Sequence, residues 1–429
     1  MTSQHKPINT EPSEQSHITC PACGLLCDDL TVCQQKDQLA LDSHGCELAQ
    51  VFFHQPSLAS SPKINGQDTS LAQAVQAAAK LLSESKQSLF AGLGTDVGGM
   101  RALLRLVNQT GGYLDHMNSP AGLRNIQVLQ QSGWQTTTLT EVKQRADVIL
   151  IVGTNIVSQH PRFFQRVLWQ GDSLFAEQLP EREIIVLGPA DLDISPLTSP
   201  TGKAAQHIVC EHQDLPQVLA ALHALVLDQP IANSSVASIP LTRLQGLVDK
   251  LKAAKYSVLT WLAKELDFAH ADLSVQQITQ TVRALNQLTR SSALPLGGSD
   301  GDYSVYQVNT WTTGYPIRNR WHNNQAQYDP YHFSAEQLQS ECDLRVWISC
   351  LNAKAPPKSD LKTIIIGHPA LQDCPAAVFI PVRIPGLQQS GTLFRLDGSV
   401  SLPIQAVVDS PLASLQQVLA QLEEAIHAD

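Results

Sequence analysis

The stretch TLTEVKQRADVILIVGTNIVSQHPR, residues 138–162, decides the fold. At its centre is the near-continuous apolar run DVILIVG, residues 147–153, which ends at a glycine. Such a run is typical of a parallel strand covered by helices on both faces. The terminal glycine marks the point where a strand turns toward a helix or a ligand. The stretch therefore predicts one strand of an open parallel sheet.

The same pattern repeats along the chain from about residue 60. Further strands are predicted at 88–94, 183–188, 256–262, 344–350, 362–367 and 376–381. Amphipathic stretches that predict helices lie at 70–85, 97–110, 214–228, 273–290 and 411–426. Alternation of this kind implies βαβ units, and hence an α/β fold with parallel sheets.

Composition limits the class of protein. With 429 residues and 43% hydrophobic content, the chain can form two or three packed domains. A formal net charge of -10 and the lack of a basic stripe argue against a nucleic-acid or anionic-membrane surface. The longest apolar runs fall far short of the roughly 20 residues that cross a bilayer. The polar opening also lacks the features of a secretory signal, so we expect a cytoplasmic protein.

These patterns suggest a division of the chain. Residues 1–17 are expected to be a disordered tail, because they hold almost nothing that could be buried. Residues 18–58 form a small cysteine-rich module with no helix of consequence. One α/β domain is expected from 59–114 plus 294–429, and a second, Rossmann-like, from 115–293.

The stretch 297–333 is irregular and rich in aromatic residues, so we expect it to be functional or to contact a partner protein. Its aromatic residues are Trp311, Tyr315, Trp321, Tyr328 and Tyr331.

The N-terminal module contains the pattern C-x2-C-x3-C-x18-C, formed by Cys20, Cys23, Cys27 and Cys46. Four thiolates spaced in this way can hold an iron–sulfur cluster, in which each iron takes one protein sulfur. A zinc site is the rival, although zinc modules more often use two C-x2-C pairs. Four buried structural cysteines are the third possibility. Cys33 falls in a predicted strand and is not expected to be a ligand.

Several stretches resemble the molybdopterin oxidoreductase superfamily and, within it, the B subunit of formylmethanofuran dehydrogenase. The similarity extends from about residue 18 to the C-terminus. The stretches that carry it are CPACGLLCDDL, residues 138–162, NTWTTGYPIRNRWHNNQAQYDPYHFS and GTLFRLDG. The resemblance implies a molybdopterin-oxidoreductase-like fold, with a small cysteine-rich module followed by two Rossmann-like parallel-sheet α/β domains.

The resemblance also implies where a metal would be held. In redox-active relatives the N-terminal cysteines bind a [4Fe–4S] cluster. A pterin-bound molybdenum or tungsten takes a Cys or selenocysteine ligand that is followed by His. Ungapped alignment from GWQTTTLTEVKQRADV places these two positions at Ala121 and Gly122, neither of which can bind a metal. We therefore expect no molybdopterin-bound metal, with an oxygen ligand from Asp115 or Asp96 as the rival.

The function implied is that of a non-redox relative. In the bacterial formyltransferase/hydrolase complex, a formyl group moves from tetrahydromethanopterin to a furan carrier and is hydrolysed to formate. The expected partners are amidohydrolase-like, scaffold and formyltransferase subunits. One alternative is the catalytic subunit of an active molybdenum or tungsten formylmethanofuran dehydrogenase. Another is a zinc-stabilised binding module with no role in one-carbon metabolism.

Five residues are candidates for a pterin-like pocket. Four of them, Gly153, Asn155, His160 and Arg162, follow the strand at 147–153, at the carboxyl end where α/β sheets bind ligands. The fifth, Arg318, belongs to a small basic island in PIRNRWHNN that suits an anionic ligand. A role at an interface, or local pairing of the arginines with carboxylates, is the alternative.

Overall fold

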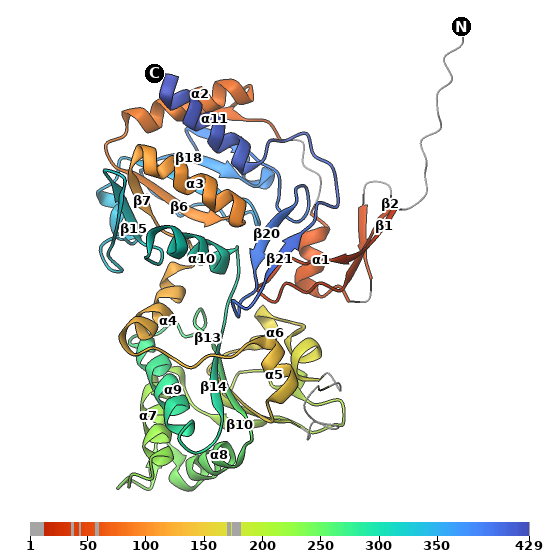
Figure 1. The fold of residues 1–429 in the computed structure, drawn as a ribbon, viewed down its shortest axis with the longest axis vertical. Coiled ribbons are helices and arrows are strands. Elements are labelled where there is room, and N and C mark those ends of the chain that lie inside the picture. The colour runs from red at the N-terminus through yellow and green to blue at the C-terminus, as the bar shows by residue number, and fades with distance from the viewer. Residues whose placement is uncertain are drawn as a thin grey trace.

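The computed structural model describes residues 13–35, 38–42, 44–55, 60–169, 173 and 182–428. Figure 1 shows two lobes, one above the other, with a small N-terminal module beside them. We name them the large-sheet lobe and the small-sheet lobe. Both sheets have parallel strands, which confirms the predicted α/β fold.

The large-sheet lobe contains nine strands in the order β16-β15-β7-β6-β17-β18-β19-β4-β5. The strands from β7 to β19 in this order are parallel, and the edge strands pair antiparallel. Its strands are β4 (Lys63–Ile64), β5 (Gln67–Asp68), β6 (Ser88–Gly94), β7 (Gly112–Leu114), β15 (Asn319–His322), β16 (Gln325–Tyr328), β17 (Leu344–Ser349), β18 (Lys362–Gly367) and β19 (Val378–Pro381). Its helices are α2 (Leu71–Glu84), α3 (Val97–Thr110), α10 (Asp302–Thr313) and α11 (Leu415–Ala428), with the 3-10 turns Gln337–Ser340 and Pro369–Leu371.

The small-sheet lobe contains five parallel strands in the order β10-β9-β8-β13-β14. They are β8 (Val148–Val152), β9 (Glu183–Gly188), β10 (Gln206–Val209), β13 (Ser257–Leu262) and β14 (Ser291–Leu296). The helices are α4 (Ser119–Ser132), α5 (Leu139–Arg145), α6 (Ile156–Gln159), α7 (Leu215–Val226), α8 (Leu241–Ala253) and α9 (Ala271–Leu285). Shorter elements are the π-helix Phe164–Leu168, the 3-10 turns Ser195–Leu197 and His212–Asp214, and the hairpin of β11 (Ser235–Val236) and β12 (Ile239–Pro240).

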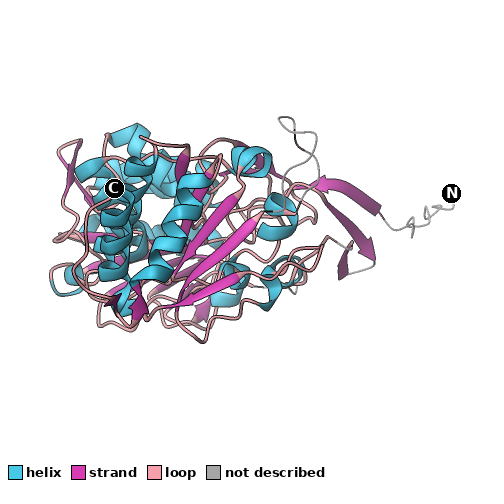
Figure 2. Cartoon of the chain, turned by 90° about the horizontal axis from the view of Figure 1, so that it is seen from below, coloured by secondary structure: helices cyan, strands magenta, loops and turns pink. Residues whose placement is uncertain are grey.

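The N-terminal module consists of a three-stranded antiparallel sheet and one short helix. Its elements are β1 (Ser13–Ile18), β2 (Leu30–Gln35), β3 (Gln38–Leu41) and α1 (Glu47–Phe53). In Figure 2 these strands project away from the rest of the molecule. A C-terminal hairpin of β20 (Gly391–Phe394) and β21 (Ser401–Ile404) lies near α1 in Figure 1.

Two expectations for the N-terminal region were wrong. Residues 13–17, predicted as part of a tail, belong to β1 and pair with β2, because a strand can be held by its backbone ladder even when its side chains are polar. The rest of the predicted tail lies outside the described residues. The module also contains α1, whose Phe52 and Phe53 are buried, so tertiary packing stabilises a helix of only seven residues.

One stretch expected to be irregular is largely regular. The stretch 297–333 contains α10 and the β15–β16 hairpin, and β15 extends the large sheet by pairing with β7. The sequence of α10, DYSVYQVNTWTT, is rich in β-branched and aromatic residues, which are weak helix formers. The segment around Ala121 is the first part of α4, where Pro occupies the first turn and Gly133 ends the helix.

In both sheets the strand order reverses near the centre, because successive strands are added on opposite sides of a central strand. In the large sheet the chain passes from β6 to β7 on one side, and β17 joins β6 on the other side. In the small sheet β9 and β13 flank β8 in the same way. Ligands of open α/β sheets bind at the carboxyl ends of strands beside such a switch point. No helix in the described residues has the length and apolar character needed to cross a bilayer.

Candidate functional site

A cavity of about 840 Å³ lies at the carboxyl ends of strands from both sheets. Lys264 follows β13, and Asn352 and Lys354 follow β17. The segment after β14, residues 297–300, forms another wall. The cavity therefore lies where the topology of both lobes predicts a ligand site.

Ala121 and Gly122 both line this cavity, in the first turns of α4. A methyl group and a hydrogen offer no electron pair, so neither can bind a metal. Space is also lacking at Gly122, because a Cβ built there would lie 2.7 Å from Tyr306 Oη. The residues at this position do not fit a pterin-bound metal.

The two carboxylates considered as substitute ligands have other partners. Asp115 accepts a hydrogen bond from the Ala335 amide at 2.7 Å, and its Oδ1 lies 3.5 Å from Arg318 Nε. Asp96 caps α3 by accepting from the Gly99 amide at 2.9 Å. Neither lines the cavity among the described residues, and their partners lie elsewhere in the fold.

A group of polar residues forms one wall of the cavity. Asn118 donates to Ser299 Oγ at 2.9 Å and lies 3.4 Å from Asp300 Oδ2. Asn352 donates to Asp300 Oδ1 at 2.7 Å. Burial, reinforced by the charge of Asp300, raises the pKa of Asp302 to about 7. Sequence analysis did not single out these two aspartates, although they lie in the 297–333 stretch that it marked as functional.

His160, one of the predicted pocket residues, does line the cavity. It is 3% exposed, and within the described residues neither of its ring nitrogens has a hydrogen-bond partner. Burial lowers its pKa to about 4, so the ring is neutral at pH 7. Neither ring nitrogen is accessible from the cavity, so other atoms of the residue form its part of the wall.

The other predicted pocket residues have structural contacts instead. Gly153 adopts a positive φ of 62° at the end of β8. The Asn155 side chain caps α6 by accepting from the Ser158 amide. Arg318 lies beside Asp115 and donates to Ser119, the local pairing that was the alternative for this basic island. Within the described part of the chain, none of the three lines the cavity.

The four cysteines of the N-terminal pattern line a second, small cavity together with His44 and Arg162. The loop between them closes through a hydrogen bond of 2.8 Å from Cys20 N to Cys27 O. Burial raises the pKa of Cys23 to about 12 and that of Cys27 to about 11. Without a bound cation these thiols stay protonated at neutral pH.

The donor set of this second cavity is four thiols, which suits an iron–sulfur cluster or zinc. Within the described residues, no three His, Cys, Asp or Glu side chains are arranged to hold one metal ion. Cys33 lies in β2, as predicted, and does not line the cavity.

Arg162 belongs to this cysteine site rather than to the large cavity. Its guanidinium donates to both oxygens of Asp29 at 2.7 and 2.6 Å, while Arg166 pairs with Asp28 at 2.7 Å. Burial opposes ionisation of Asp29, but the hydrogen bond from Arg162 and the positive charges of Arg166 and Arg162 together outweigh it and lower the pKa of Asp29. Asp28 and Asp29 thus join the N-terminal module to the small-sheet lobe.

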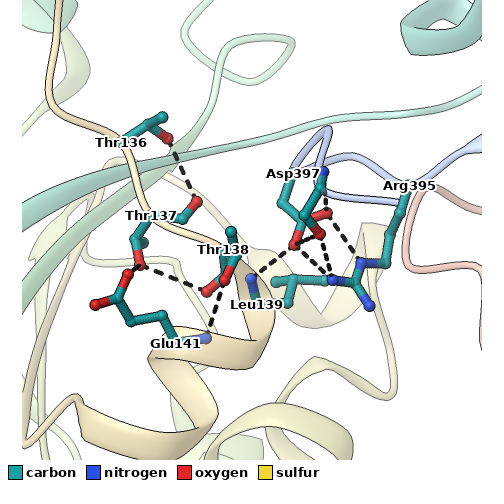
Figure 3. Close-up of polar contacts among 8 residues, drawn as sticks. Thr136, Thr137, Thr138, Leu139, Glu141, Arg395 and Asp397 are labelled. Carbon is teal, nitrogen blue, oxygen red and sulfur yellow. Dashed lines mark hydrogen bonds and ion pairs between the residues drawn. The ribbon is translucent and has the colours of Figure 1, made fainter. Parts of the chain in front are cut away.

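The C-terminal hairpin also reaches the small-sheet lobe, beside the large cavity. Figure 3 shows the side chain of Asp397 between Arg395 and the start of α5. Asp397 Oδ2 accepts from the Leu139 amide and from Arg395 Nη2, both at 2.8 Å. Thr138 caps α5 by accepting from the Glu141 amide at 3.0 Å. Leu396, Asp397 and Thr136 all line the cavity, so this contact supports one of its walls.

The aromatic residues predicted to contact a partner form a partly exposed surface. Trp311, Tyr315 and Tyr331 are 54%, 41% and 64% exposed. Tyr315 stacks on Tyr328 with ring centroids 5.8 Å apart. Exposed aromatics of this kind are enriched at protein interfaces.

The known proteins most similar in sequence that we report are B subunits of two related enzyme complexes. No protein-family model matches the chain. The B subunit of tungsten-containing formylmethanofuran dehydrogenase 2 from Methanocaldococcus jannaschii is 26% identical over 92% of this chain and 94% of its own length. The B subunit of the formyltransferase/hydrolase complex Fhc from Methylorubrum extorquens is 28% identical over 75% of this chain and 84% of its own length. The resemblance predicted from sequence motifs is therefore confirmed.

Solved structures agree with these sequence matches. A chain of the Methylorubrum extorquens complex FhcABCD, solved with methylofuran, has a TM-score of 0.74 and 25% identity, over 86% of this chain and 99% of that chain. Acetylene hydratase from Pelobacter acetylenicus has a TM-score of 0.65 over 96% of this chain and 69% of that chain. At 10% identity, this second match shows the fold alone.

Proposed function

From its similarity to the B subunit of formylmethanofuran dehydrogenase along 92% of its length, we propose that this chain is the corresponding subunit of a formyltransferase/hydrolase complex. The subunit has no redox activity of its own and serves as a structural component in one-carbon metabolism. The match to a chain of FhcABCD, 99% of which is covered, supports this assignment.

The observation that carries the proposal is the pair Ala121 and Gly122 on the wall of the large cavity. A dehydrogenase of this kind needs a ligand that fixes and tunes its metal, and these two residues supply none. Formyl transfer and hydrolysis need no electron transfer, so the complex needs no redox metal in this subunit. Subunits other than this one carry out the chemistry. The partners are amidohydrolase-like, scaffold and formyltransferase subunits. The exposed aromatic residues Trp311, Tyr315 and Tyr331 are the surface we assign to one of them.

The complex works in the cytoplasm. All nine cysteines of the chain, each within the described residues, are free thiols, which suits a reducing compartment.

Purification of the native complex from its source organism tests this function. We expect the three partner subunits to co-purify, with formyl-transfer and hydrolysis activity and without molybdenum or tungsten. Stoichiometric molybdenum or tungsten with bound pterin would overturn the proposal in favour of an active dehydrogenase. A chain that purifies without partners would also contradict it.

Cys20, Cys23, Cys27 and Cys46 are proposed as ligands of a [4Fe–4S] cluster with a structural role. Four thiols around one cavity, beside the positive charge of Arg162, suit an anionic cluster. Anaerobic preparations should contain about four irons and four sulfides per chain. Cys46→Ser should lose them, whereas the matched Cys33→Ser should keep them. Zinc in place of iron, or equal iron in both variants, would contradict this assignment.

A further inference from the structure

One wall of the small cysteine cavity comes from a different part of the molecule. Arg162, which follows α6 in the small-sheet lobe, lines this cavity together with the four cysteines of the N-terminal module. Its three guanidinium nitrogens all donate hydrogen bonds, two to the oxygens of Asp29 at 2.7 and 2.6 Å and one to Gln165 Oε1 at 3.1 Å. A positive charge in a fixed position therefore forms part of the wall around the thiols.

The carboxylates that pair with this guanidinium do not cancel its charge at the cavity. Within the described residues, Arg162 lines the cavity, whereas Asp28 and Asp29 do not. The side chains of Asp29 and Asp28 are 36% and 53% exposed, compared with 7% for Arg162. Water screens the exposed carboxylates more strongly than the buried guanidinium. Arg166, which pairs with both carboxylates, adds a second positive charge on the same side, so this wall is positive toward the cavity.

A positive wall matters for the kind of metal centre that four thiols can hold. A [4Fe–4S] cluster bound by four thiolates has a net negative charge, which one added electron increases. The reduction potential of such a cluster depends on nearby charge, on hydrogen bonds to its sulfurs and on solvent exposure. A buried positive charge beside the sulfurs favours the reduced state, because its attraction grows with the negative charge and is little screened.

We propose that Arg162 sets the reduction potential of the cysteine site, by holding its positive charge against the [4Fe–4S] cluster. This inference rests on the cluster that we assign to the four cysteines. Asp29 is a positioning residue, because its two oxygens fix the guanidinium at the cavity wall. The sulfur ligands come from the N-terminal module and the charge comes from the small-sheet lobe. The site is therefore complete only when these two parts of the chain are packed together.

A redox titration of the full-length protein, purified without oxygen, tests this inference. Dithionite supplies one electron to each cluster, and electron paramagnetic resonance measures the reduced fraction. We expect Arg162→Gln to lower the equilibrium constant for reduction about tenfold, which lowers the one-electron potential by about 59 mV. Arg162→Lys keeps the positive charge and should retain most of the wild-type potential. The exposed Arg101→Gln should leave the potential unchanged.

Asp29→Asn separates the effect of charge from a loss of packing. The amide oxygen still accepts a hydrogen bond from the guanidinium, but the negative charge is gone, so the potential should rise. A site that is merely loosened would shift in the same direction in Asp29→Asn and Arg162→Gln. An unchanged potential in Arg162→Gln, or shifts of the same sign in both variants, would overturn the inference. If Arg162→Gln fails to fold, Asp29→Asn decides, because an unchanged or lower potential in that variant contradicts the proposal.

The wild-type protein separates this inference from the cluster assignment. A wild-type protein that contains no iron–sulfur cluster would overturn both. A wild-type cluster whose potential does not respond to Arg162→Gln would overturn the inference alone. Neither measurement requires the partner subunits, so the proposed role in the complex is tested independently.

Discussion

Arg162 binds both carboxylate oxygens of Asp29, through hydrogen bonds of 2.7 and 2.6 Å. The two residues are separated by 133 positions, so this ion pair joins the cysteine module to the small-sheet lobe. The Arg162 side chain is 7% exposed and also lines the cysteine cavity. Because Arg162 contacts both parts, loss of its side chain should destabilise the contact between the cysteine module and the small-sheet lobe.

Loss of this ion pair should destabilise the protein. Arg162→Ala leaves Asp29 with Arg166 alone, and we expect the free energy of unfolding to fall by about 2–3 kcal/mol. Chemical denaturation followed by circular dichroism measures this change in the free energy of unfolding. The exposed Arg101→Ala should change stability by less than about 0.5 kcal/mol. Equal losses in the two variants would show that the pair contributes nothing.

A methyl group at Gly122 should be unfavourable despite its position in a helix. Alanine normally stabilises a helix relative to glycine by about 0.5–1 kcal/mol. At Gly122 the new Cβ would lie 2.7 Å from Tyr306 Oη, so we expect Gly122→Ala to cost about 1–2 kcal/mol.

A matched substitution separates this steric cost from helix propensity. A Cβ built at Gly246 in α8 has no heavy atom within 4 Å, so Gly246→Ala should stabilise by about 0.5–1 kcal/mol. Combining Gly122→Ala with Tyr306→Leu should remove the extra cost. Additive effects in this double-mutant cycle would mean that the two residues do not compete for space.

Removal of the Asp397 carboxylate should separate the C-terminal hairpin from α5. The side chain is fully buried and accepts from both Leu139 N and Arg395. Asp397→Ala removes the acceptor of the Leu139 amide and of Arg395 Nε, while Arg395 Nη2 keeps Ser399 Oγ, and we expect a loss of about 3 kcal/mol in thermal or chemical unfolding. The exposed Asp409→Ala is the control, and a similarly small change in both would refute this role.

His160 should make the folded state sensitive to acid. Its pKa in the folded protein is about 4, below the ordinary histidine value of 6.5. The unfolded chain therefore takes up a proton as the pH falls through 6.5, while the folded protein does not, so stability decreases between pH 6.5 and 4. His160→Gln should reduce the loss between about pH 7 and 4.5 by about 2–3 kcal/mol. The exposed His427→Gln should leave the slope unchanged, and an unchanged slope in His160→Gln would contradict the prediction.

Much of the fold could be predicted from the chain because local pattern and final environment agree. The run at 362–367 has an apolar centre of three isoleucines and forms β18 over those residues, and the run at 88–94 forms β6 with every residue buried. A strand that is covered by helices on both faces is a near-continuous apolar run, and such a run can be recognised in the sequence without knowledge of its neighbours. By contrast, β1 is polar and α10 is a weak helix by propensity, so only pairing and packing with distant segments explain them.

For the candidate site, too, some features could be read from the sequence and others could not. The sequence alone determined that position 121 carries a methyl group and that four cysteines share one short region, because side-chain chemistry and spacing are written directly in the residues. Only the tertiary structure decided that Tyr306 lies against Gly122, that Asp300 and Asp302 face the same cavity, and that Asp29 meets Arg162. These contacts join residues far apart in the chain. Their geometry follows from how the two sheets and the N-terminal module pack together, which no local pattern encodes.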